Sequence, residues 1–406
     1  MIASVRPLKL GIVAGEPSGD RLGAGLVSAL QRSHADTPVE LYGVGGDLLA
    51  DCGLNSLVAL AELSMHGFAE PLQRLPFLWS LLRRIEEQML DERVDVFVGV
   101  DFNVFNLLLE GRLKRRGIPV VHYVSPSVYA WRRGRTHRVA RSCDVLLTLF
   151  PFEPPLYVDT PVRAVFVGHP LADEIEPATN PIDDQTRRAH ARQLFDLPPG
   201  DSPVVTLMPG SRTSEVRQML RPFLHTALLV LEQQPGARFL LPCASAEIET
   251  QVREALSKRE FAALPMIPVD GQAREALRAS DAALIKSGTS TLEAMLLGVP
   301  MVVAYRLPAV TYQIVKRLLR TNFVALPNIL AAEELVPELL QHDMQPAKLA
   351  LALRAQLSDR QLLAAPLNSA ASASIKARFA AIHQSLRCNA SVNAAGEVLR
   401  LVRSRA

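Results

Sequence analysis

Short apolar runs that end in Gly, Ser or Pro alternate along this chain with longer segments whose apolar residues recur at helical spacing. Such alternation is typical of strand–helix units, whose strands pair in parallel and whose helices cover both faces of the sheet. The sequence therefore predicts an α/β protein with doubly wound parallel sheets. The predicted strands are LKLGIVAG, VELYGVGG, VDVFVGVD, IPVVHYVSP, CDVLLTLFPF, RAVFVGHP, VVTLMPGS, ARFLLPCA, MIPVD, AALIKSG and PMVVAYR.

Two blocks of these units flank a polar, Pro-rich stretch, NPIDDQTRRAHARQLFDLPPGDSP, which indicates a domain boundary. With 406 residues, the chain is long enough for two domains with buried cores. Its C-terminal part is rich in Ala and Leu at helical spacing and predicts a helical tail. Ligands of doubly wound sheets bind at the carboxyl ends of the strands, so the residues that follow each strand are the first candidates for function.

Charge and cysteine content exclude several classes of protein. Lys and Arg total 44 and Asp and Glu total 41, so bulk charge does not favour a nucleic-acid-binding protein. The widely spaced Cys52, Cys143, Cys243 and Cys388 predict neither a disulfide framework nor a thiolate metal cage, and they favour a reducing compartment. No apolar run reaches the roughly 18 residues of a membrane-spanning helix, so we expect a soluble or peripheral protein.

The first strand ends in the turn GEPSGD, which is not the G-x-G-x-x-G of dinucleotide-binding proteins. The second strand ends in glycines and not in the acid that would bind a ribose, so NAD binding is disfavoured. The turn offers Glu16, Ser18 and backbone N–H groups at a helix start, which suit hydroxyl groups or an anion. The alternative is a purely structural turn in which Asp20 caps the helix.

In the second block, the stretch VVTLMPGSRTSEV predicts a strand, a turn and a helix. Gly210 and Ser211 allow the backbone to approach an anion, and Arg212 can bind a phosphate with two hydrogen bonds.

The stretch AALIKSGTSTLEAML repeats this arrangement with the small residues Ser287, Gly288 and Thr289 at a helix start. Glu293 can accept hydrogen bonds from ribose hydroxyls, and its alternative role is that of capping-box partner to Ser290. Two such turns in one block predict that a nucleotide diphosphate binds there.

The strand VDVFVGVD ends in Asp101, a candidate general base because an acid at the carboxyl end of a buried strand faces the ligand edge of the sheet. The alternative is an N-cap for the helix near Leu107. The chain lacks an Asp-x-Asp pair, H-E-x-x-H and the P-loop motif. We therefore expect Arg212 and helix N-termini, and no metal, to stabilise a leaving diphosphate.

The stretch MHGFAEPLQRLPFLWSLLRRIEEQM combines dense apolar side chains with flanking arginines. This combination predicts a helix that lies at a bilayer interface or holds acyl chains, and the alternative is a core-packing helix with a basic edge. The residues predicted to make this contact are Phe68, Leu72, Phe77, Leu78 and Trp79.

The motifs VAGEPSGDRLGAGL, HYVSPSVYAWR, LLTLFPFE, VGHPLAD, LMPGSR, SGTSTLE, VPMVVAYR and LPNIL occur in this order. In this combination the chain resembles the bacterial lipid-A-disaccharide synthases of glycosyltransferase family 19 over essentially its whole length. The resemblance implies an inverting enzyme of the GT-B type, with two Rossmann-like domains facing a cleft. The implied reaction joins UDP-2,3-diacylglucosamine to 2,3-diacylglucosamine 1-phosphate (lipid X). Its products are the lipid A disaccharide 1-phosphate and UDP.

The resemblance also implies roles for single residues. Asp101 matches the base that takes the proton of the acceptor hydroxyl, and Arg212 matches the contact to the UDP phosphates. The implied donor-binding set is Gly210, Ser211, Arg212, Ser287, Gly288, Thr289, Glu293 and Asn328, whereas Glu16 and Ser18 lie on the acceptor side. The resemblance implies neither a metal nor a cofactor.

The implied organisation is an acceptor- and membrane-facing domain over residues 1–175, a UDP-sugar domain over 176–365, and a helical tail over 366–406. By resemblance, the tail is exchanged between the subunits of a homodimer. We expect a cytoplasmic enzyme that is peripheral on the inner face of the inner membrane and has no nucleic-acid partner.

One motif departs from the family, which usually follows the motif Asp with Ala-Pro-Asp-Phe-Asn. Here Asp101 is followed by Phe-Asn-Val-Phe-Asn, so Val104 replaces the second acid. His66 also replaces a residue that is commonly apolar. Any role of the second acid is therefore expected to be absent or moved, and His66 and Phe102 are expected to reshape the acyl or sugar pocket.

Two alternatives share parts of this interpretation. A UDP-sugar 2-epimerase has the same two-domain form and a UDP site, but it needs no lipid-binding surface such as the cluster from Phe68 to Trp79. A peripheral lipid-binding protein with decayed nucleotide sites would not need Arg212, Glu293 and Asp101, which are all present.

Overall fold

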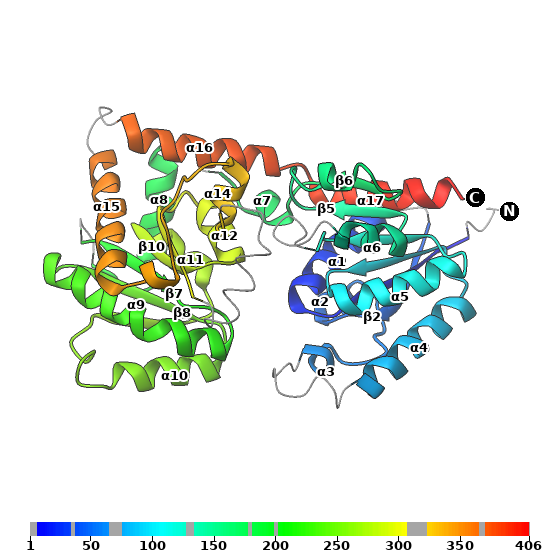
Figure 1. Cartoon of the computed structure of the whole chain (residues 1–406), viewed down its shortest axis with the longest axis horizontal. Coiled ribbons are helices and arrows are strands. Elements are labelled where there is room, and N and C mark those ends of the chain that lie inside the picture. Colours follow the sequence, from blue (N-terminus) through cyan, green and yellow to red (C-terminus); the bar gives the residue numbers. More distant parts are fainter. Residues whose placement is uncertain are drawn as a thin grey trace. The chain divides into compact units, whose positions relative to one another are not determined.

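A computed structural model of the chain describes residues 6–33, 37–64, 75–126, 134–177, 181–198, 202–306, 323–364 and 370–405. The chain forms two compact units (Figure 1). Unit 1 contains residues 1–173 together with 386–406, and unit 2 contains residues 174–385. Each unit is built around one six-stranded parallel sheet, so the predicted α/β class with two doubly wound sheets is confirmed.

The sheet of unit 1 has the strand order β2-β1-β3-β4-β5-β6. The chain passes from β1 outward to β2 and then returns to β3 on the other side of β1, so the order reverses between β1 and β3. The strands are β1 (Leu8–Ala14), β2 (Val39–Val44), β3 (Val96–Val100), β4 (Val120–Tyr123), β5 (Val145–Thr148) and β6 (Arg163–Phe166). The helices are α1 (Pro17–Ser33), α2 (Asp47–Asp51), α3 (Leu60–Ser64), α4 (Leu75–Asp91), α5 (Asn103–Arg115), α6 (Gly134–Ser142), η1 (Pro154–Tyr157), α7 (Pro170–Glu174) and α17 (Ala390–Arg403).

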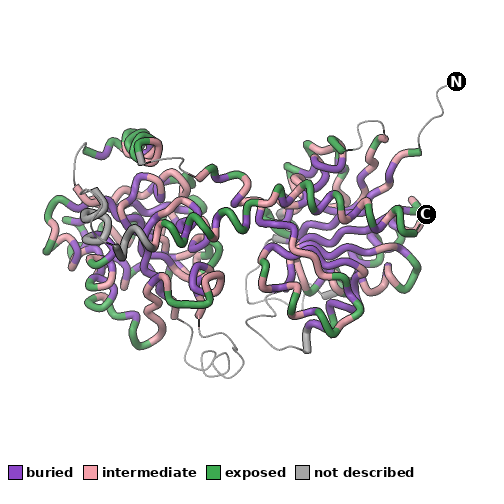
Figure 2. The backbone as a smooth tube through the Cα atoms, turned by 90° about the horizontal axis from the view of Figure 1, so that it is seen from above, coloured by how far each residue is buried: buried purple, intermediate pink, exposed green. Residues whose placement is uncertain are grey.

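Successive residues of each strand point to opposite faces of this sheet, and both faces are covered. Val98 packs with α1 and α17, whereas its neighbour Phe97 packs with α4, α5 and α6. Every residue of β3 is buried, which is why its sequence is continuously apolar. In Figure 2 the strands of this sheet form a buried layer between half-exposed helices.

The last helix, α17, belongs to unit 1 although all of unit 2 precedes it in the chain. Ala394 and Val398 of α17 are fully buried against Leu26 and Leu30 of α1. Hydrogen bonds tie this return of the chain to unit 1: His169 N–H donates to Leu386 O at 2.9 Å. The backbone N–H groups of residues 389 and 390 both donate to the Asp173 carboxylate.

The sheet of unit 2 has the order β12-β11-β10-β7-β8-β9, which reverses between β7 and β10. The strands are β7 (Val204–Met208), β8 (Arg238–Cys243), β9 (Met266–Asp270), β10 (Ala282–Lys286), β11 (Met301–Tyr305) and β12 (Glu338–Leu340). The described helices are α8 (Pro181–Gln193), α9 (Thr213–Gln233), α10 (Ala246–Leu256), α11 (Ala273–Ala279), α12 (Thr289–Leu296), α14 (Leu326–Ala331), η2 (Gln341–Asp343), α15 (Pro346–Ala364) and α16 (Ala370–Leu386). All strands predicted from the sequence are present, and the three-residue β12 was not predicted because it is too short to show a pattern.

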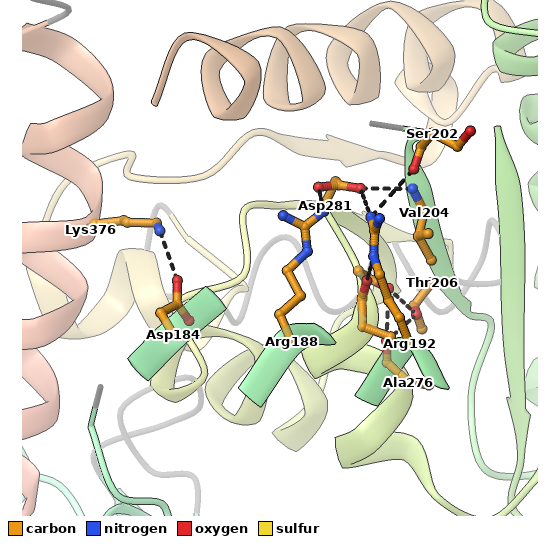
Figure 3. Close-up of polar contacts among 11 residues, drawn as sticks. Asp184, Arg188, Arg192, Ser202, Val204, Thr206, Ala276, Asp281 and Lys376 are labelled. Atoms are coloured by element: carbon orange, nitrogen blue, oxygen red, sulfur yellow. Dashed lines mark hydrogen bonds and ion pairs between the residues drawn. The ribbon is translucent and has the colours of Figure 1, made fainter. Parts of the chain in front are cut away.

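The polar stretch that indicated a domain boundary contains a docked helix, α8 (Figure 3). Arg188 and Arg192 of this helix both pair with Asp281, the residue before β10, and Arg192 Nη2 lies 2.7 Å from Asp281 Oδ2. The same Oδ2 accepts the N–H of Val204, the first residue of β7, at 2.8 Å. These ion pairs, together with the buried apolar residue Ala191, hold α8 to unit 2, which explains why its polar sequence resembles a linker.

Among the residues that the structure describes, no helix is both long and apolar enough to cross a membrane.

Candidate functional site

Two clusters of the predicted residues lie at the points where the strand orders reverse. The Asp101 cluster of unit 1 comprises Asp101, which follows β3, and the segment from Glu16 to Ser18, which follows β1 and begins α1. The Arg212 cluster of unit 2 comprises the turn from Gly210 to Arg212, after β7, and the turn from Ser287 to Thr289, after β10. Doubly wound sheets bind ligands at such reversals.

Asp101 has an unusual backbone conformation for a residue with a side chain. Its φ is +49° and that of Phe102 is +47°, two consecutive left-handed residues. Asn106 stabilises this strained pair, because its Nδ2 donates to Asp101 O at 2.8 Å and to Val13 O and Val100 O at 3.2 and 3.3 Å. The N-cap of α5 is Phe102, so the alternative interpretation of Asp101 as an ordinary N-cap is wrong. Strain of this kind is characteristic of functional sites.

Burial raises the pKa of the Asp101 carboxyl above its ordinary value, and the nearby charge of Glu16 raises it further. His122 and the N–H of Phe102 act in the opposite direction. A carboxylate whose pKa is raised in this way is a stronger base than one in water, which suits proton abstraction from a hydroxyl.

A chain of polar side chains lies behind Asp101, half-buried at Asn103 and fully buried at His122 and Glu110. Asn103 Nδ2 donates to Asp101 Oδ1 at 2.9 Å, and Asn103 Oδ1 lies 3.1 Å from Nε2 of His122. His122 Nδ1 in turn lies 2.6 Å from Oε1 of Glu110. The side chains of His122 and Glu110 are both fully buried. The sequence did not single out these three residues, although a histidine in the buried strand VVHY and an acid in the apolar helix segment LLLEG are signals of such a network.

Glu16 and Ser18 are exposed on the turn beside Asp101. The turn is close to Phe102, because a Cβ on Gly15 would lie 2.4 Å from the Phe102 ring. Asp20 lies inside α1 and caps another helix: its carboxylate accepts the N–H of Gly46, the N-cap of α2, at 2.7 Å. The interpretation of Asp20 as the cap of its own helix is therefore wrong.

In unit 2, Arg212 is exposed at the start of α9, and its side chain is 69% accessible. Glu215 lies beneath it and binds three donors: Arg212 Nη1 at 3.3 Å, Ser211 N–H at 3.3 Å and Lys286 Nζ at 2.9 Å. Although burial opposes ionisation, the hydrogen bond and charge of Lys286 lower the pKa of Glu215. Glu215 therefore fixes two cations and one N–H at the strand ends, an arrangement suited to an anion. Gly210 has a φ of +137°, which a residue with a side chain rarely adopts.

The second turn of unit 2 exposes Gly288 and Thr289 at the start of α12, while Ser287 Oγ donates to Val324 O at 2.9 Å. Gly288 is the N-cap, so the alternative interpretation of Glu293 as capping-box partner to Ser290 is wrong. Glu293 instead accepts from Arg274 Nε at 2.9 Å. The sequence analysis missed Lys286, Glu215 and Arg274, because the contacts of Lys286 with Glu215 and of Arg274 with Glu293 depend on the fold.

Asn328 is fully buried in α14, and its amide is used entirely within the chain. Its Nδ2 donates to Val336 O and to Glu338 Oε1, and its Oδ1 accepts the N–H groups of Leu335 and Val336. An amide has two donor hydrogens and two acceptor lone pairs, so all four are satisfied. In this arrangement Asn328 shapes the loop beside Ser287 and leaves no group for a ligand.

The apolar stretch predicted to contact lipid is described only in part, since Phe68, Leu72 and His66 lie outside the described residues. Phe77 and Trp79 of α4 are 38% and 47% accessible, whereas Leu78 packs against the core of unit 1. The Arg112 guanidinium lies 5.5 Å from the centre of the Trp79 ring. Together with Arg112 of α5, the helix therefore presents an apolar and basic surface, while its other side packs in the core.

The described part of the chain contains no group of three or more His, Cys, Asp or Glu side chains arranged to hold a metal ion.

Comparison with known proteins gives one consistent family. The sequence model of the lipid-A-disaccharide synthetase family matches residues 10–398. The lipid-A-disaccharide synthase of Pseudomonas aeruginosa strain UCBPP-PA14 is 45% identical over 98% of this chain and 99% of its own length. That of Chromobacterium violaceum is 43% identical over 98% of both chains.

Solved structures with the same fold are more distant in sequence. A putative UDP-N-acetylglucosamine 2-epimerase from Listeria monocytogenes has a TM-score of 0.60 and 12% identity, and it covers 98% of this chain and 96% of its own. MurG from Acinetobacter baumannii has a TM-score of 0.56 and 16% identity, with coverage of 97% and 99%. These two structures share the two-unit architecture of the GT-B type.

Proposed function

Because the chain belongs to the lipid-A-disaccharide synthase family, we propose that its two clusters perform the two halves of one glycosyl transfer. The enzyme joins UDP-2,3-diacylglucosamine to 2,3-diacylglucosamine 1-phosphate and releases UDP and the lipid A disaccharide 1-phosphate. The observation that carries this function is identity above 40% to lipid-A-disaccharide synthases along nearly the whole chain.

On the acceptor side, Asp101 is the general base. Its carboxylate takes the proton of the acceptor 6-hydroxyl as that oxygen attacks the anomeric carbon of the donor, with inversion. Three observations support this role: the position at the strand reversal, the strained backbone, and the pKa that burial and Glu16 raise. Glu16 and Ser18 lie on the neighbouring turn and bind acceptor hydroxyls.

On the donor side, the Arg212 cluster binds UDP and stabilises its diphosphate as it leaves. Arg212 and Lys286 supply positive charge, and the N-termini of α9 and α12 supply backbone N–H groups with favourable dipoles. Glu293 binds the ribose, which requires that its pair with Arg274 leaves one carboxylate oxygen available. Asn328 supports the site indirectly through the loop beside Ser287.

The acyl chains of both substrates require a lipid surface, and we assign this contact to α4. Its exposed Phe77 and Trp79 suit the headgroup region of a bilayer. The enzyme then works as a peripheral protein on the cytoplasmic face of the inner membrane. The proposed homodimer is compatible with α17, which docks as a separate element that a second copy of the chain can supply.

The test is UDP release from UDP-2,3-diacylglucosamine, measured with and without 2,3-diacylglucosamine 1-phosphate in the presence of EDTA. We expect release that depends on the acceptor, together with a disaccharide product. UDP release at the same rate with and without the acceptor would contradict glycosyl transfer and favour an epimerase. Loss of UDP release in EDTA would contradict a metal-independent site.

A further inference from the structure

The polar chain behind Asp101 has a geometry that fixes one carboxylate oxygen and leaves the other for chemistry. We propose that Asn103, His122 and Glu110 are positioning residues that hold Asp101 in one orientation, with Oδ1 bound and Oδ2 presented to the acceptor hydroxyl. This inference rests on the proposed role of Asp101 as the base. The proton moves from the hydroxyl oxygen to Oδ2, and the three residues transfer none.

The hydrogen bonds determine which atoms carry protons. The Asp101 carboxylate is an acceptor, so Asn103 must turn its Nδ2 toward Oδ1, and its own Oδ1 then faces His122. An amide oxygen accepts only, so Nε2 of His122 carries a hydrogen. Nδ1 of His122 and Oε1 of Glu110, 2.6 Å apart, then share a single proton. The hydrogen bonds therefore all donate toward Asp101: His122 Nε2–H donates to Asn103, and Asn103 Nδ2 donates to Asp101.

Burial makes this arrangement rigid. Glu110 and His122 are fully buried, and a Cβ on Gly99 would lie 2.0 Å from Glu110 Oε1, so the strand has no room for a side chain there. Within the described residues, Oε2 of Glu110 and Oδ1 of Asn106 are both buried without a partner. These residues are four apart on α5 and thus on one face of the helix. Asn106 also binds Asp101 O, so the network reaches Asp101 through its side chain and its backbone.

The titratable groups around this network come from several elements. Glu16 faces Asp101 from the β1–α1 turn, and His122 faces it from β4, with Glu110 of α5 behind. Burial raises the pKa of Glu110, and it raises that of the Cys143 thiol next to Glu110 well above its ordinary value. The side-chain amide of Asn103 donates to the Asp101 carboxylate and stabilises its ionised form. Removal of this amide must therefore raise the pKa of Asp101.

The experiment compares kcat/KM as a function of pH for Asn103→Ala, Asn103→Asp and the control Val104→Ala. Val104 is the next residue of α5 and is 77% exposed. We expect Asn103→Ala to lower kcat by roughly 10-fold, as for loss of a hydrogen bond to a charged group, with KM nearly unchanged. The acid limb of the kcat/KM profile should move to higher pH in Asn103→Ala, because the donor to Asp101 is lost. It should move further in Asn103→Asp, which also adds a second negative charge. Val104→Ala should retain the profile of the unmodified enzyme.

A second measurement does not depend on activity. In the ¹⁵N spectrum of labelled histidine, the His122 signal, identified by its loss in His122→Gln, should show a protonated Nε2 that Asn103→Ala perturbs. Thermal melting of each variant establishes that it is folded.

The outcomes separate this inference from the proposed role of Asp101. If Asp101→Ala is inactive while Asn103→Ala has the profile and rate of Val104→Ala, the positioning role is overturned and the base stands. If Asp101→Ala keeps full activity, the base role of Asp101 and the positioning role of Asn103 are both overturned. An unprotonated Nε2 in His122 would also overturn the proposal, because the order of donors would be reversed.

Discussion

Two buried histidines of unit 1 differ because their partners differ. His122 has a carboxylate on one side and an amide on the other. Among the described residues, the hydrogen bond to the ring of His169, which precedes α7, comes from the N–H of Leu171, 3.2 Å from its Nδ1. Burial without a charged partner lowers the pKa of His169 from 6.5 to about 4, so this residue is neutral in the folded protein at neutral pH.

The lowered pKa of His169 predicts that unit 1 loses stability in mild acid. Between pH 6.5 and 4 the unfolded chain binds a proton that the folded chain does not, so the free energy of unfolding falls as the pH falls. We expect a loss of about 2 kcal/mol from pH 7 to pH 5. Denaturant unfolding at both pH values should show a smaller difference in His169→Gln. The same substitution at the exposed His137 should leave the difference unchanged.

The proposed base gives a direct kinetic prediction. Asp101→Ala should lower acceptor-dependent UDP release by about 100-fold or more, because general-base catalysis contributes factors of this size. Binding of UDP to unit 2 should be unchanged, as measured by calorimetry. A variant that retains the rate would remove Asp101 from this role.

At this scale, the sequence identifies residues by their position after a strand and not by their partners. Asp101, Arg212 and Ser287 follow apolar runs and were found in this way. Asn103, His122 and Glu110 come from α5 and β4, and their contacts depend on how these elements pack. The cap of α2 by Asp20 was missed for the same reason, because its partners at residues 46 to 49 lie across the fold.

At the scale of elements, α17 shows what periodicity can and cannot predict. Its apolar spacing predicts a helix, but the surface that it covers belongs to α1 and to the sheet of unit 1. Arg163 of β6 and Glu397 of α17 add an ion pair at this contact. The strands were predicted well because their apolar runs result from burial on both faces of a sheet. The surface on which a helix packs depends instead on the fold of the whole chain.

The packing of α17 predicts a large difference between two valines of one helix. Val398 is fully buried and Val392 is 50% exposed. Val398→Ala should lower the free energy of unfolding by about 2 kcal/mol, from lost burial and the cavity left behind. Val392→Ala should change it by less than about 0.5 kcal/mol. Equal effects in denaturant unfolding would mean that α17 does not pack here in solution.

The exposed aromatic residues of α4 predict binding to lipid. The double substitution Phe77→Ser and Trp79→Ser should reduce co-sedimentation with anionic phospholipid vesicles several-fold, because two apolar side chains no longer enter the bilayer interface. Leu351→Ser provides a control, since Leu351 is a 68% exposed apolar residue on α15 of unit 2. Unchanged binding by the double variant would place the lipid contact elsewhere.

At the scale of the molecule, the sequence predicts two strand–helix blocks but not the path of the chain between the units. The chain passes from unit 1 to unit 2 near residue 173 and returns near residue 386. The apolar face of α17 predicts burial, but nothing in its local pattern indicates which unit it covers. Unit 2 is therefore one continuous segment, whereas unit 1 is assembled from two.

This connectivity predicts how the units fold when they are separated. Residues 174–385 should unfold cooperatively on their own, because they contain their own sheet and core. Residues 1–173 alone should not, since Leu26 and Leu30 would lose their cover. A permuted unit 1, in which residues 386–406 precede residues 1–173 through a flexible linker, should recover cooperative unfolding by circular dichroism. Cooperative unfolding of residues 1–173 alone would contradict the structure.

The late position of α17 also affects the protein while it is being made. Helix α1 leaves the ribosome early, but its partner α17 is translated only after both sheets are complete. At about 5–20 residues per second, this interval lasts on the order of tens of seconds. Throughout that time the apolar surface of α1 that α17 covers stays exposed, as in the substrates that chaperones bind. A nascent chain that terminates before α17 keeps this surface exposed, which distinguishes it from the finished enzyme.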